Sequence, residues 1–130
     1  MNTLLKANNI SKNYGDLKVL DKISLKVEEK EIVTIVGPSG AGKTTLLNIL
    51  GTLDDPNPDH ETSLIIDGND VTKMTEKSMA KFRNDNIGFI FQFHELLPEF
   101  SALENVCIPS WLNKENVNVK AKAKDLLSSM

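Results

Sequence analysis

The stretch that decides the fold runs from residue 37 to residue 44 and reads Gly-Pro-Ser-Gly-Ala-Gly-Lys-Thr. It fits the pattern G-x-x-x-x-G-K-[ST], whose glycines let several backbone N–H groups approach one polyphosphate without a Cβ in the way. Lys43 would supply a mobile positive charge for the β- and γ-phosphates, and the Thr44 hydroxyl would coordinate Mg²⁺. The hydroxyl of the next residue would face the α-phosphate. The pattern therefore predicts a phosphate-binding site formed by Gly37, Pro38, Ser39, Gly40, Ala41, Gly42, Lys43, Thr44 and Thr45.

The sequence on both sides of this stretch supports the same interpretation. Residues 32–36 are nearly all apolar and rich in β-branched side chains, which predicts a strand buried on both faces. Residues 46–50 carry apolar side chains at helical spacing, and Gly51 suits the left-handed position just past a helix end. A helix that begins near Lys43 would point its positive end at the phosphates. A glycine-rich turn that binds nothing is the alternative, and the order strand, loop, helix disfavours it.

Other segments predict a mixture of strands and turns. Residues 23–27 alternate apolar and polar side chains, as in a half-exposed antiparallel strand. Residues 63–67 predict a short strand that ends in a turn at Asp67-Gly68, and residues 87–91 predict a further strand. Residues 54–62 are polar and contain two prolines, which indicates an exposed loop.

Three helices are expected in the second half of the chain. Thr75 can cap a helix over residues 76–84. The S-x-x-E spacing of Ser101 and Glu104 predicts a capping box, with a helix that begins near residue 102. A last helix is expected from about Val119. Strands that lead into helices define an α/β fold class.

Composition and charge narrow the possible functions. The chain has 130 residues, of which 40% are hydrophobic and 25% charged, as in an ordinary globular domain. The net charge is −3 and neither half is basic, so nothing indicates nucleic-acid binding. Cys107 is the only cysteine, which excludes an intrachain disulfide. No apolar run approaches the roughly 20 residues that cross a bilayer, so we expect work at a membrane only through docking onto a protein that spans it.

Residues 87–106 resemble the Q-loop region of ABC transporter ATPases, and the segment Phe-His-Glu-Leu-Leu-Pro-Glu-Phe at 93–100 is most similar to the lipoprotein-releasing type, then to the macrolide-export type. The resemblance implies an adenine-stacking role for Tyr14, which lies 23 residues before Gly37. It implies that Gln92 reaches Mg²⁺ or the attacking water. Lys43 and Gln92 are then the catalytic candidates, with ATP and Mg²⁺ as cofactors.

The same resemblance implies an incomplete domain. The family's signature motif, its Walker B strand with the catalytic glutamate, and its switch histidine are expected downstream of residue 130. We therefore expect residues 1–130 to be one P-loop NTPase domain of the ABC type, truncated before the signature, with an N-terminal antiparallel β portion and the start of the helical subdomain at about 101–130. In this family, strands of the missing half lie between the strands expected at 32–36 and 87–91, which would otherwise lack neighbours.

The resemblance also implies a function for the full-length protein. It would be the ATP-binding subunit of a transporter, active as a homodimer and bound to membrane permease subunits on the cytoplasmic face of the cell membrane. The full-length protein would be an ATPase, and the 130-residue piece alone would be inactive. Two alternatives are a short non-catalytic nucleotide-binding regulatory module and a small P-loop kinase, although a kinase lid needs several arginines and Arg83 is the only one.

Overall fold

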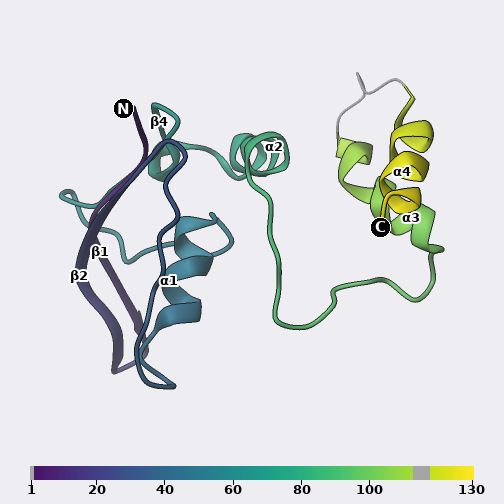
Figure 1. Ribbon diagram of the computed structural model, residues 1–130. Helices are drawn as coiled ribbons and strands as arrows, with labels where there is room; N and C mark the ends of the chain where they lie inside the picture. The colour runs from purple at the N-terminus through teal and green to yellow at the C-terminus, as the bar shows by residue number, and fades with distance from the viewer. Residues whose placement is uncertain (1, 113–117) are drawn as a thin grey trace. The chain divides into compact units, whose positions relative to one another are not determined.

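The computed structural model describes residues 2–112 and 118–130. The chain forms two compact units, Met1–Arg83 and Asn84–Met130, which we describe separately (Figure 1). None of the helices within the described residues is long and apolar enough to cross a membrane.

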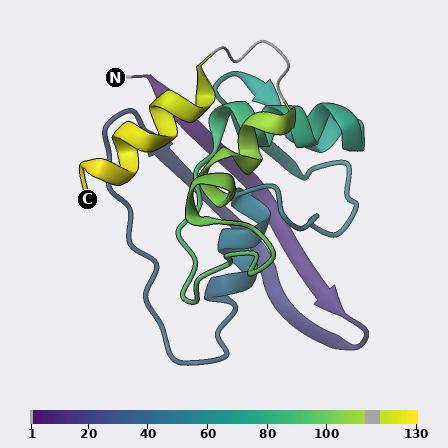
Figure 2. The same ribbon diagram turned by 90° about the vertical axis from the view of Figure 1, so that its right-hand side faces the viewer.

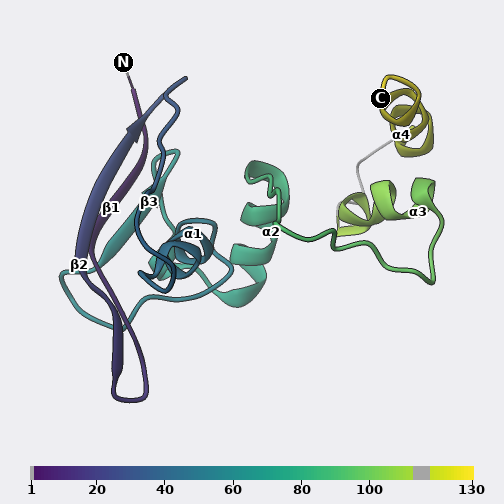
Figure 3. The same cartoon turned by 60° about the horizontal axis from the view of Figure 1, so that its bottom comes forward.

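The first unit is built on a four-stranded antiparallel sheet in the order β2-β1-β3-β4. The strands β1 (Thr3–Tyr14) and β2 (Leu17–Glu28) form a long curved hairpin (Figure 3), and the short strands are β3 (Ser63–Ile66) and β4 (Asn69–Asp70). The strands predicted at 23–27 and 63–67 are thus confirmed.

The predicted turn after β3 is also confirmed. Asp67 and Gly68 both have positive φ, 47° and 78°. Two consecutive residues with positive φ are typical of a type I′ turn, whose twist matches that of an antiparallel pair.

The helix α1 (Lys43–Leu50) covers one face of this sheet (Figure 1). Its buried side chains are Leu46 and Ile49. Removal of their apolar surface from water is the main contribution that holds the helix on the sheet. The sheet and the segment after it complete the core of this unit with Ala7, Ile10, Leu20, Leu64, Ile66 and Val71.

The end of α1 differs from the prediction by one residue. Gly51 has φ −84°, and the left-handed residue is Thr52 with φ 65°. Thr52 is buried, and Arg83 donates to its side-chain oxygen at 3.0 Å and to its carbonyl at 2.6 Å. These contacts hold Thr52 in a conformation that local sequence alone would assign to the glycine.

Two further helices follow in this part of the chain. The short 3₁₀ helix η1 (Val71–Lys73) leads into α2 (Glu76–Asn86). The predicted cap is confirmed, because the Ser78 amide donates to Thr75 Oγ1 at 3.2 Å.

The second unit contains α3 (Ala102–Cys107), the 3₁₀ helix η2 (Ile108–Leu112) and α4 (Val119–Ser128) (Figure 2). The capping box is confirmed in both directions: the Glu104 amide donates to Ser101 Oγ, and the Ser101 amide donates to Glu104 Oε1, each at 3.1 Å. The helix expected from about Val119 is also confirmed.

The strands predicted at 32–36 and 87–91 are wrong for this structure, because neither segment is in a strand. Ile32 is 94% exposed, and Val36 and Ile90 are exposed as well. A buried β-strand needs neighbours for its backbone groups and side chains. Within the described residues no strand pairs with either segment, so several of their apolar side chains remain exposed to solvent.

Candidate functional site

The glycine-rich loop leads directly into the first turn of α1. Gly40 and Gly42 have φ of 80° and 90°, which L side chains rarely adopt. The Ala41 amide donates to the Pro38 carbonyl at 3.2 Å, and the Leu46 amide to the Gly42 carbonyl at 2.9 Å. No side chain caps the N-terminus of α1. The free N–H groups of its first turn can therefore serve an anion.

Gly42 fixes this loop against the sheet. A Cβ at this position would lie 3.0 Å from the Val19 carbonyl oxygen and 3.1 Å from the side chains of Val19 and Leu20. Only glycine satisfies both this close approach and the positive φ. The start of α1 is thus held on β2.

The Lys43 ammonium crosses the loop. Its Nζ donates to the Gly37 and Pro38 carbonyls, both at 2.7 Å. An ammonium has three N–H donors, so one remains for an incoming phosphate oxygen. The positive charge therefore lies over the loop's first residues, next to the N-terminus of α1.

The two hydroxyls that follow Lys43 lie on the first turn of α1, with Thr44 exposed and Thr45 half-buried. Backbone amides, an ammonium and hydroxyls are a donor set that suits a polyphosphate. Among the described residues, no group of three or more His, Cys, Asp or Glu is arranged to hold a metal ion. A divalent cation would fit here only when phosphate oxygens complete the coordination offered by the Thr44 hydroxyl.

Tyr14 lies at the end of β1, at the same end of the hairpin as the loop. Lys12 pairs with Leu20 across the hairpin, Tyr14 pairs with Leu17, and Leu20 is next to Gly42. The tyrosine is half exposed, and its hydroxyl donates to Asp54 Oδ2 at 2.9 Å.

Sequence reasoning missed the residues that contact Tyr14. The Lys12 Nζ lies 5.4 Å from the centre of the Tyr14 ring and 2.9 Å from Asp54 Oδ1. The sequence indicated only that residues 54–62 form an exposed polar loop after α1. It did not indicate that Asp54 in this loop contacts Tyr14.

Gln92 belongs to the second unit, where it is exposed and outside any helix or strand. The structure places Tyr14 and the phosphate loop at the same end of the hairpin in the first unit. The role of Gln92 at Mg²⁺ stays a prediction.

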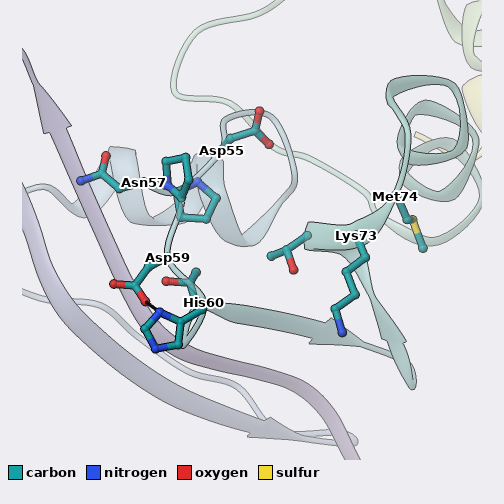
Figure 4. A pocket seen from close by; sticks show the side chains of 10 residues that line it. Asp55, Asn57, Asp59, His60, Lys73 and Met74 are labelled. Atoms are coloured by element: carbon teal, nitrogen blue, oxygen red, sulfur yellow. Dashed lines mark ion pairs between the residues drawn. The ribbon is translucent and has the colours of Figure 1, made fainter.

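A wide surface cavity of about 980 Å³ lies elsewhere in the first unit, between the loop after α1 and η1 (Figure 4). Its lining includes Asp55, Asp59, His60 and Lys73. None of its lining residues comes from the phosphate loop, so this cavity is not the candidate phosphate site.

An antiparallel sheet covered by a helix that follows a glycine-rich loop is consistent with part of a P-loop NTPase fold. The family described as ABC transporter matches residues 20–130. The chain therefore belongs to the ABC transporter family.

Two relatives carry the name "Lipoprotein-releasing system ATP-binding protein LolD". The one from Bacteroides thetaiotaomicron is 50% identical over 128 residues, which cover 98% of this chain and 57% of the relative. The one from Bacteroides fragilis is 58% identical over 104 residues, which cover 79% and 46%. The chain thus matches about half the length of these relatives.

A solved structure shares the fold. It is the dimeric, post-hydrolysis state of the ATP-binding cassette MJ0796 bound to ADP and Pi, with a TM-score of 0.83 and 34% identity. The match covers 95% of this chain and 56% of that one. The family resemblance and the fold class predicted from the sequence are confirmed.

Proposed function

We propose that this chain is part of the ATP-binding subunit of an ABC transporter of the lipoprotein-releasing type. The observation that carries the proposal is the loop at 37–42, fixed on β2 by Gly42 and crossed by the Lys43 ammonium. The names of the two relatives support the transporter type. The proposed ligand is ATP with Mg²⁺.

The proposed roles combine the sequence motif, the geometry of the loop and the family resemblance. The amides of the loop and of the first turn of α1 bind the phosphates, and the Thr45 hydroxyl adds a donor. Lys43 binds the β- and γ-phosphates and Thr44 holds Mg²⁺. Tyr14 stacks on the adenine. Mg²⁺, when bound, neutralises charge on the phosphates.

The rest of the proposal concerns the whole protein. Residues 1–130 form part of one nucleotide-binding domain, with the helical subdomain from about residue 101. Gln92 orients the attacking water, and a second subunit completes each site. ATP binding and hydrolysis are coupled to the permease subunits. The nucleotide-binding domain lies on the cytoplasmic face of the membrane. The apolar segments 32–36 and 87–91 support the assignment of residues 1–130 to part of a larger domain. Their exposed side chains fit strands that would pair with further parts of the protein.

The proposal is tested by steady-state ATP hydrolysis in the complete protein, assembled with its membrane partners. A preorganised cation at the transferring phosphoryl group contributes several kcal/mol in the transition state. Lys43→Ala should therefore lower the rate more than tenfold. Lys6→Ala removes the same charge from an exposed position on β1 and should leave the rate unchanged. A Lys43→Ala rate above one tenth of wild type contradicts the assignment.

A further inference from the structure

Three side chains outside the phosphate loop form one connected cluster. Asp54 accepts hydrogen bonds from Lys12 Nζ and from the Tyr14 hydroxyl, both at 2.9 Å, on its two different oxygens. Lys12 Nζ also donates to the Asp55 carbonyl at 2.7 Å and lies 5.4 Å from the centre of the Tyr14 ring. The tyrosine is thereby held at its hydroxyl and on its ring.

The two ionisable partners Lys12 and Asp54 are largely withdrawn from solvent. Only 15% of the Lys12 side chain and 32% of the Asp54 side chain are exposed. Burial by itself raises the pKa of Asp54, but the hydrogen bonds from Lys12, Tyr14 and the Asp55 amide outweigh it and keep that pKa below its ordinary value. Asp54 is therefore a carboxylate that accepts from both partners. Hydrogen bonds to a charged acceptor are the stronger kind.

The segment that carries Asp54 connects the cluster to the phosphate loop. It follows α1 directly, and the Leu53 amide donates to the Asn48 carbonyl at 2.8 Å. A few residues later it is bound along β1, where the Asn57 amide donates to the Ser11 carbonyl at 2.8 Å and Asn57 Oδ1 accepts from the Asn13 amide at 3.2 Å. The helix whose first turn serves the phosphates thus ends in the segment that holds the tyrosine.

We propose that Asp54 and Lys12 are positioning residues that hold the Tyr14 ring in place as the platform for the nucleotide base. This inference rests on the proposed function, in which Tyr14 stacks on adenine. A flat surface that is already fixed before binding loses less conformational freedom when the base stacks on it. The cluster should therefore affect the base end of the ligand and leave the phosphate end unaffected.

The test compares two probes on the 130-residue chain by calorimetry: ATP, which has a base, and inorganic tripolyphosphate, which has none. Tyr14→Phe removes the donor of the Tyr14–Asp54 hydrogen bond, and Asp54→Asn removes the charge of the acceptor and one of its two oxygens. Each should weaken ATP about threefold to tenfold, less than the full effect of a hydrogen bond to a charged group, because the bond holds the tyrosine and does not contact the ligand. Each should leave the affinity for tripolyphosphate within twofold of the wild type. Asp21→Asn, at an exposed ion pair with Lys18, is the matched control and should change neither.

A spectroscopic measurement separates positioning from a general effect on stability. Tyr14 is the only tyrosine, so labelled tyrosine gives a single set of ring signals in NMR. In the wild-type protein ATP should shift these signals, and tripolyphosphate should leave them in place. In Asp54→Asn the signals of the free protein should change, and the ATP-induced shift should be smaller.

The outcomes distinguish the inference from the proposed function. If Tyr14→Ala leaves ATP affinity unchanged, the stacking role fails, and the inference fails with it. If Tyr14→Ala weakens ATP while Asp54→Asn and Tyr14→Phe bind it as the wild type does, only the positioning role is overturned. Equal weakening of ATP and tripolyphosphate by Asp54→Asn would show that Asp54 supports only the fold.

Discussion

Gly42 is a position where both the backbone conformation and the packing require glycine. Its φ is 90°, and a Cβ at this position would lie 3.0 Å from the Val19 carbonyl oxygen, so both conformation and contact exclude larger residues. Gly68 also has positive φ, 78°, but a Cβ at that position would have no atom within 4 Å. The two glycines therefore separate the cost of conformation from the cost of close contact.

Gly42→Ala should destabilise the chain by about 2–5 kcal/mol, because the positive φ costs about 1–2 kcal/mol and the overpacked contact about 1–3 kcal/mol. Gly68→Ala should cost only the conformational part, about 1–2 kcal/mol. Urea denaturation of both variants measures the difference. Equal losses would mean that the contact with β2 is unimportant.

Asp70 gives a pH-dependent prediction at the same scale. Its carboxylate accepts from the Thr72 hydroxyl at 2.6 Å and from the Thr72 amide at 3.1 Å, and Lys73 lies 3.6 Å away. Burial raises the pKa of Asp70, but the bonds from Thr72 and the charge of Lys73 outweigh it, so the pKa lies below its ordinary value.

A lowered folded-state pKa contributes stability that is present above the unfolded value of about 3.9 and is lost as pH falls through the folded value. The wild type should therefore be more stable than Asp70→Asn at pH 7, and the gap should narrow below about pH 4. Thermal melts of both proteins from pH 7 to pH 3 measure this. A gap that stays constant over that range would contradict the assignment.

At the scale of single elements, α3 depends on its cap. It has six residues, and its only buried side chain is Cys107, so packing holds it weakly. Ser101 satisfies the Glu104 amide that an uncapped helix would leave without a partner.

Ser101→Ala should cost about 1 kcal/mol of local helix stability. Hydrogen exchange at the Glu104 amide should then become about fivefold faster. Ser101→Thr keeps the hydroxyl and serves as the control, with exchange near the wild-type rate. Unchanged exchange in Ser101→Ala would show that the cap does not hold this helix.

At the scale of the whole molecule, local patterns predicted local structure and failed where burial depends on distant neighbours. The alternation at 23–27 and the capping box of Ser101 are encoded within a few residues, so both were predictable. The apolar run at 32–36 is suited to a buried strand, but no described strand pairs with it.

Contacts between residues far apart in the sequence could not be predicted. The cluster around Tyr14 joins β1 to Asp54, 40 residues away, and no short motif indicates such a contact. Thr52 took the left-handed position because Arg83, 31 residues away, binds it.

The exposed apolar segments predict that the 130-residue chain self-associates. Ile32, Val36 and Ile90 are exposed, and unpaired backbone beside apolar side chains favours pairing with a second copy. Sedimentation velocity should show a mass that rises with concentration. Ile32→Glu together with Val36→Glu should shift the equilibrium toward the monomer. A monomeric wild type at high concentration contradicts the prediction.

The central claim, that the loop at 37–42 with Lys43 binds the phosphates of ATP, is tested most directly by ATP affinity in the 130-residue chain. Calorimetry on the wild type, Lys43→Ala and the control Lys6→Ala, each with Mg²⁺, is the measurement. A hydrogen bond to a charged group contributes about 1.5–3 kcal/mol, so Lys43→Ala should bind ATP at least tenfold more weakly, and Lys6→Ala should match the wild type. Equal ATP affinity in the wild type and in Lys43→Ala would contradict the account.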